Sequence, residues 1–187
     1  MNLPRLNRDG ALYLVAFISC IPIANWMIGN VGTKCVPNGP CLVPVWPGIM
    51  APSGVLMIGF ALVLRDLVQQ RLGRSWAIAA IMIGALVSGL VAPPTLVVAS
   101  MVAFTVSEFA DFAVYTPLQE KRFFFAVIAS SFAGAVADSF LFLWLAFGSL
   151  EFLSGQIMGK IWAVIAAFPA IFIIRRRLQF TNMASHQ

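Results

Sequence analysis

The chain has 187 residues, of which 60% are hydrophobic and only 10% charged, and its formal net charge is +5. Soluble domains carry about 25% charged residues, so this composition excludes an ordinary soluble domain and favours a membrane protein. The positive charge does not indicate a nucleic-acid partner, because the basic residues flank apolar runs instead of forming a stripe. We therefore expect the surface of the protein to contact the lipid bilayer, and we do not expect it to bind nucleic acid.

Six apolar runs predict an all-α integral membrane protein whose six transmembrane helices form one transporter domain over residues 1–187. At a rise of about 1.5 Å per residue, each run comes close to the thickness of a bilayer. The second run is short, so we expect residues 44–48 either to extend it or to form a re-entrant segment. The polar segment from Arg65 to Arg74 is expected to be a loop. The runs cover residues 11–29, 49–64, 76–92, 95–116, 123–147 and 152–174.

The distribution of basic residues predicts that both termini are cytoplasmic. Of the 12 lysines and arginines, Lys34 lies in an outer loop and Lys160 in the sixth run, which leaves ten in the inner segments. The positive-inside rule places such segments in the cytoplasm, so we expect a multi-pass protein of the inner (plasma) membrane. The ten are Arg5, Arg8, Arg65, Arg71, Arg74, Lys121, Arg122 and Arg175 to Arg177.

Two cysteines, Cys35 and Cys41, lie in the loop that this orientation places outside the cell. A disulfide can persist there, and the alternative is a pair of free thiols in a mobile loop. A metal site is less favoured, because no histidine or acidic residue lies nearby. We expect no metal and no cofactor.

Acidic residues interrupt the apolar sequence of the fourth and fifth runs. Glu108 and Asp111 share one helical face of the fourth run, and Asp138 lies on one face of the fifth with Ser131. An ionised group at bilayer depth costs on the order of 3 kcal/mol or more, so such residues mark a site by default. The sequence therefore predicts a binding site inside the membrane.

Counting residues from the outer ends of the helices brings Asp138 and Lys160 to the same depth. Asp138 precedes Phe147 by nine residues and Lys160 follows Phe152 by eight, which at about 1.5 Å per residue differs by less than ~2 Å. We expect an ion pair, with Gln156 one turn from Lys160, because buried charges are paired. Two interpretations stay open: the pair only locks two helices, or it opens to meet a substrate.

Glu108 and Asp111 are expected to lie deeper, toward the cytoplasmic side. No intramembrane cation other than Lys160 is evident in the sequence, so one of these carboxyl groups is expected to be protonated or hydrogen-bonded. Arg65 and Asp66 are expected at the inner end of the second helix, either as an interfacial pair or as a gate.

Four segments occur in this order along the chain: RDLVQQRLG, SEFADFAVYTPLQ, ASSFAGAVADSFLFLWLAF and GQIMGK. Together they resemble the vitamin uptake transporter (VUT) family, over roughly residues 59–162. The resemblance implies an inner-membrane importer of 7-cyano-7-deazaguanine or a related 7-deazapurine, precursors of the tRNA nucleoside queuosine. It also singles out Asp66, Asp111, Asp138 and Lys160.

The residue types are also suited to a small planar heterocycle. A carboxylate accepts the adjacent N–H and NH₂ groups of a deazaguanine in a bidentate pair. The ring carbonyl needs a donor such as Lys160, Gln156 or Ser131, and the ring needs an aromatic wall. A pterin or flavin would use the same groups, so the chemistry alone does not choose among them.

Several functions follow from this pattern, and a secondary transporter is the first. Transport by such a protein is expected to be coupled to protons through Asp111 or Asp138. The alternative is facilitated diffusion, in which the substrate is retained because it is incorporated into tRNA. The second is a substrate-binding subunit that needs a separate energising module, and a homodimer is one option for assembly. We do not expect an enzyme: the single histidine, His186, lies in the tail, and no GxGD or phosphate-loop motif occurs.

Overall fold

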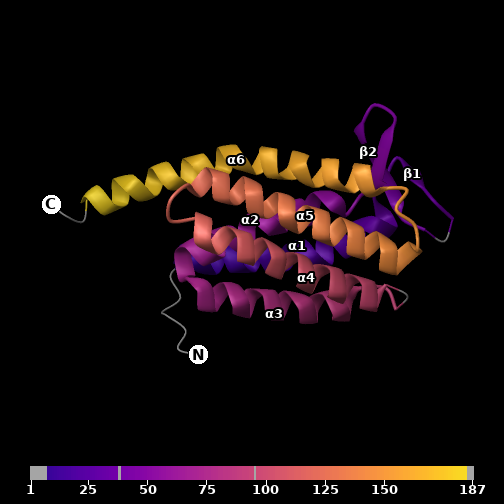
Figure 1. Cartoon of the computed structure of the whole chain (residues 1–187), viewed down its shortest axis with the longest axis horizontal. Coiled ribbons are helices and arrows are strands. Elements are labelled where there is room, and N and C mark those ends of the chain that lie inside the picture. The colour runs from indigo at the N-terminus through magenta and orange to yellow at the C-terminus, as the bar shows by residue number, and fades with distance from the viewer. Residues whose placement is uncertain (1–7, 38, 95, 185–187) are drawn as a thin grey trace.

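The computed structural model describes residues 8–37, 39–94 and 96–184 (Figure 1). Arg5, Thr95 and His186, which the sequence analysis used, lie outside the described residues. The described residues form six helices and a small sheet. The helices are α1 Arg8–Asn30, α2 Val55–Leu72, α3 Arg74–Val91, α4 Val97–Leu118, α5 Phe123–Phe147 and α6 Leu153–Ala184.

The helices lie side by side in one bundle, with the sheet at the end opposite the two termini (Figure 1). Within the described residues, α1, α3, α4 and α5 are long and apolar enough to cross a membrane, and α6 contributes a shorter apolar stretch, Leu153–Ala167. Such a set of apolar helices is typical of a multi-pass membrane protein, as the composition predicted.

The second helix begins and ends later than the sequence predicted. We expected a span over residues 49–64 and a loop from Arg65 to Arg74, but α2 continues to Leu72. The chain then turns at Gly73, and α3 begins at Arg74. The φ of Gly73 is 88°, a value that glycine adopts readily because it has no Cβ. The apolar pattern stops at Leu64 because the next turn of α2 carries polar side chains that the bundle buries.

The segment before α2 forms an antiparallel sheet, so it does not extend the helix. Its strands are β1 Lys34–Cys35, β2 Cys41–Trp46 and β3 Ile49–Pro52, in the order β1-β2-β3. Residues 49–52 were therefore wrongly predicted as helix. In β2 the half-buried Val43 and Val45 alternate with the exposed Pro44 and Trp46, as successive side chains of a strand point to opposite faces.

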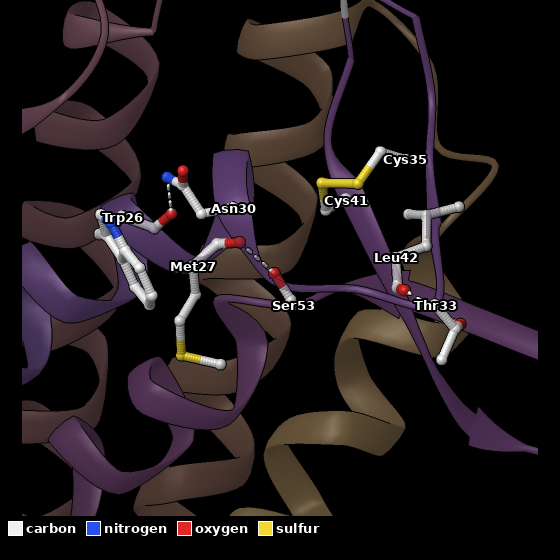
Figure 2. The surroundings of a disulfide bond; sticks show 8 residues. All are labelled: Trp26, Met27, Asn30, Thr33, Cys35, Cys41, Leu42 and Ser53. Atoms are coloured by element: carbon white, nitrogen blue, oxygen red, sulfur yellow. Dashed lines mark hydrogen bonds between the residues drawn. A yellow bond between two sulfur atoms is a disulfide. The ribbon is translucent and has the colours of Figure 1, made fainter.

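A disulfide links two strands of the sheet, and two hydrogen bonds fix the sheet to the helices. Cys35 and Cys41 are opposite one another in β1 and β2 and form a disulfide (Figure 2). The Ser53 hydroxyl donates to the Met27 carbonyl of α1 at 2.7 Å, and the Trp162 indole of α6 donates to the Val45 carbonyl at 3.0 Å. The sheet therefore covers the end of the bundle between α1 and α6.

Glycines let α2 approach its neighbours closely. A Cβ at Gly59 would lie 2.6 Å from the Ala163 Cβ and 2.9 Å from the Lys160 carbonyl oxygen of α6. A Cβ at Gly134 of α5 would lie 3.0 Å from the Asp111 Cβ of α4. Small residues at membrane helix contacts allow backbones to come together in this way, and here they hold the polar residues of four helices in fixed positions.

Candidate functional site

The interior of the bundle contains two polar clusters, one nearer the sheet and one nearer the termini. We call the first the lysine cluster, which consists of Ser139, Asp138, Gln156 and Lys160. We call the second the arginine cluster, which consists of Arg65, Asp66, Glu108, Asp111 and Ser130. Every member is buried.

The lysine cluster contains the ion pair that the sequence predicted. Lys160 of α6 is 1% exposed, and its Nζ lies 2.5 Å from Asp138 Oδ2 of α5. The ammonium also donates to Ser139 Oγ at 2.7 Å and to Gln156 Oε1 at 3.4 Å. Lys160 therefore keeps hydrogen-bond acceptors even when Asp138 engages another donor.

A cavity of about 40 Å³ lies beside this pair, toward the sheet. Asp138, Lys160 and Gln156 line it, as do aromatic and further polar side chains of α1, α3, α4 and α5. A water needs about 10–15 Å³ by this measure, so the cavity has room for a few waters and is too small for a bicyclic ring. The further polar and aromatic residues are Asn25, Ser88, Ser100, Phe104 and Phe142.

Sequence reasoning missed three of these cavity residues, namely Asn25, Ser88 and Ser100. Each is an isolated polar residue among apolar neighbours in its helix, and that was the available signal. A lone serine in a membrane helix often only bonds its own backbone, so the signal is weak. Only the packing of six helices shows that these three face the same space as Asp138.

The arginine cluster corrects our expectation for Arg65 and Asp66, which do not lie at the end of the second helix but within α2, buried inside the bundle. Arg65 is 0% exposed. Its Nη1 lies 2.9 Å from Asp66 Oδ1, its Nε donates to Glu108 Oε2 at 3.3 Å, and its Nη2 donates to Asp111 Oδ1. The cation that faces Glu108 and Asp111 is therefore Arg65, a residue that we had counted as part of an inner loop.

Further contacts hold the guanidinium in place. The ring of Tyr115 lies 5.6 Å from the Arg65 Cζ, within the range of a cation–π interaction. Arg65 Nη1 donates to Gln69 Oε1 at 3.3 Å, and Gln69 Nε2 donates to Thr116 Oγ1 at 3.1 Å. The cluster therefore joins α2 to α4 on the side of the cavity that faces the termini.

The predicted site residues thus fall into three places. Asp138, Lys160 and Gln156 line the cavity, whereas Asp66, Glu108 and Asp111 belong to the arginine cluster. Ser130 and Asp138 are eight residues apart on α5, which separates the clusters by about 12 Å along the helix. Ser131 lines a different, mostly apolar groove between α5 and α6 of about 410 Å³, into which Lys160 also projects.

Comparison with known proteins supports the resemblance stated above. Residues 90–174 match the sequence profile of the family described as "Putative vitamin uptake transporter". Neither the curated proteins nor the solved structures give a match to this chain. The matched segment covers less than half of the chain and contains Glu108, Asp111, Asp138 and Lys160. It is consistent with the predicted family, and together with the apolar helices it indicates a multi-pass membrane protein that transports a small molecule.

Proposed function

We propose that this chain imports a small planar heterocycle, a 7-deazapurine precursor of queuosine such as 7-cyano-7-deazaguanine, across the inner (plasma) membrane. We propose further that it does so as a secondary transporter. The observation that carries this proposal is the Asp138–Lys160 pair, which is buried within a bundle of apolar helices and lines a cavity. Intramembrane charges that face a cavity mark substrate pathways in membrane proteins.

The cavity supplies the groups that a deazapurine requires. The Asp138 carboxylate accepts adjacent N–H donors in a bidentate pair, and Lys160 or Gln156 donates to the ring carbonyl. Phe104 and Phe142 supply aromatic surface for the ring. The substrate competes with the Lys160 ammonium for Asp138, while Ser139 and Gln156 still solvate that ammonium.

The volume of the cavity implies that binding requires movement. Because about 40 Å³ has no room for a bicyclic ring, the sheet end of the bundle must widen to admit one. The contacts of Ser53 with α1 and of Trp162 with β2 are the ones that such widening would strain first. The arginine cluster keeps the other end closed meanwhile, which is the alternation that a transporter needs.

The test uses cells that can neither make the precursor nor import it. These cells express this chain alone and receive 7-cyano-7-deazaguanine at low concentration, and queuosine in tRNA is the readout. We expect modification to be restored by the wild type and by Glu151→Gln, an exposed control, and to be lost in Asp138→Asn and Lys160→Ala.

Two results would contradict the proposal in different ways. Uptake that persists in Asp138→Asn would remove the lysine cluster from the site. Wild-type protein that reaches the membrane and binds the heterocycle, yet restores nothing, would favour the alternative function as a substrate-binding subunit of a larger transporter.

A further inference from the structure

The arginine cluster holds one cation against three carboxyl groups in a place without access to water. Arg65, Asp66 and Asp111 are 0% exposed and Glu108 is 2% exposed. If all three acids were ionised, the cluster would carry a net charge of one minus three, or −2. Lys160, the cation of the lysine cluster, already pairs with Asp138 and so does not compensate this charge. Buried charge without compensation is costly, so the cluster needs further positive charge, and a bound proton would supply part of it.

Asp66 and Asp111 lie next to each other. Arg65 Nη1 contacts Asp66 and Nη2 contacts Asp111, and these two amino groups belong to one guanidinium. Asp111 Oδ2 is buried and has no hydrogen-bond partner among the described residues. A proton on one of the two acids would relieve the repulsion between them.

The hydroxyl of Ser130 indicates which acid carries the proton. Ser130 Oγ lies 3.3 Å from the Val127 carbonyl oxygen and 3.2 Å from Asp66 Oδ2, and a hydroxyl has a single hydrogen to donate. When it donates to Val127, its contact with Asp66 is a hydrogen bond only if Asp66 donates in return. A protonated Asp66 therefore satisfies both contacts at once.

We propose that Asp66 and Asp111 share one proton, and that this proton accompanies the substrate through the membrane. The second part rests on the proposed function, whereas the first does not. The other groups that face the pair are Arg65 and Gln69 of α2, Glu108 and Tyr115 of α4, and Ser130 of α5.

Release of the proton to water leaves both Asp66 and Asp111 ionised, in addition to Glu108, beside one guanidinium. Their repulsion weakens the contact of α2 with α4 and α5, and this opens the end of the bundle that the cluster closes. Uptake of a proton from water restores the O–H bond and closes that end again. The cycle thus needs only a proton that enters on one side and leaves on the other.

The proton itself is tested by infrared spectroscopy of the purified protein, with no transport involved. We expect a carboxylic-acid C=O band that persists at neutral pH in the wild type and in Glu120→Gln, whose carboxyl is exposed. The band should disappear in Asp66→Asn and change in Asp111→Asn. Absence of the band from the wild type would overturn the proposal even if neither variant folds. Loss of the band on addition of Na⁺ at constant pH would identify a sodium site instead.

Coupling is tested with the same protein in liposomes. With one proton per substrate, a gradient of one pH unit should give about tenfold accumulation, and Asp66→Asn should reduce that ratio to about one. Wild-type uptake that ignores the gradient would overturn the coupling. An infrared band without any wild-type uptake would mean that the proposed function fails while the proton site stands.

Discussion

At the scale of single residues, the lysine cluster raises the question of whether its ion pair serves structure or binding. Lys160 is wholly buried between α5 and α6, which suits a link between helices. Asp138 also faces a cavity, which suits a ligand. Removing one partner of a buried pair leaves an unpaired charge, whereas removing both leaves none, so a double variant separates the two roles.

We predict that Asp138→Asn and Lys160→Met each lower the free energy of unfolding by about 3 kcal/mol, whereas the double variant regains most of this loss. We also predict that none of the three supports uptake, because the double variant has no carboxylate for the substrate. Thermal unfolding in detergent and uptake by cells measure the two effects. A stable double variant that transports normally would show that the pair only joins the helices.

At the scale of the helices, the close contact between α2 and α6 positions Lys160. The Gly59 hydrogen occupies the space where a Cβ would meet both Ala163 and the backbone of Lys160. A methyl group there cannot be accommodated by rotating a flexible side chain, so the helices must move apart. The position of the ammonium relative to Asp138 depends on this contact.

We predict that Gly59→Ala lowers the free energy of unfolding by about 1–3 kcal/mol, because a methyl group overpacks the contact, and that it weakens uptake several-fold. Gly29→Ala is the matched control, since a Cβ at Gly29 meets nothing within 4 Å. The measurements are thermal unfolding in detergent and initial uptake rate. Equal behaviour of the two variants would show that α2 and α6 do not need this contact.

The same helices show what could be predicted from the sequence. The apolar runs of α3, α4 and α5 are long, so their positions were predicted closely, and equal depth was enough to predict the Asp138–Lys160 pair. The continuation of α2 was missed, because Arg65 is a polar residue at the end of an apolar run. Its carboxylate partners on α4 are 43 and 46 residues away, and nothing local indicates that an arginine will be buried there.

At the scale of the whole molecule, the described basic residues of the connections gather at one end. Arg71 and Arg74 flank the turn between α2 and α3, and Lys121 and Arg122 lie between α4 and α5, all at the end of the bundle that carries the termini (Figure 1). Lys34 lies at the sheet end. Basic residues remain on the cytoplasmic side, so this asymmetry predicts that the sheet and the nearby cavity face outward.

Labelling of single cysteines tests this orientation. In a variant with Cys20, Cys35 and Cys41 replaced by serine, we predict that a membrane-impermeant maleimide labels Ser149→Cys in intact cells. Lys121→Cys, equally exposed in the structure but at the other end, should react only after the membrane is opened. The reverse pattern would place the cavity end in the cytoplasm. Because proton and substrate are proposed to cross together, the proton gradient would still drive import, but the incoming substrate would meet the arginine cluster first, so the orientation decides at which end of the bundle the substrate enters.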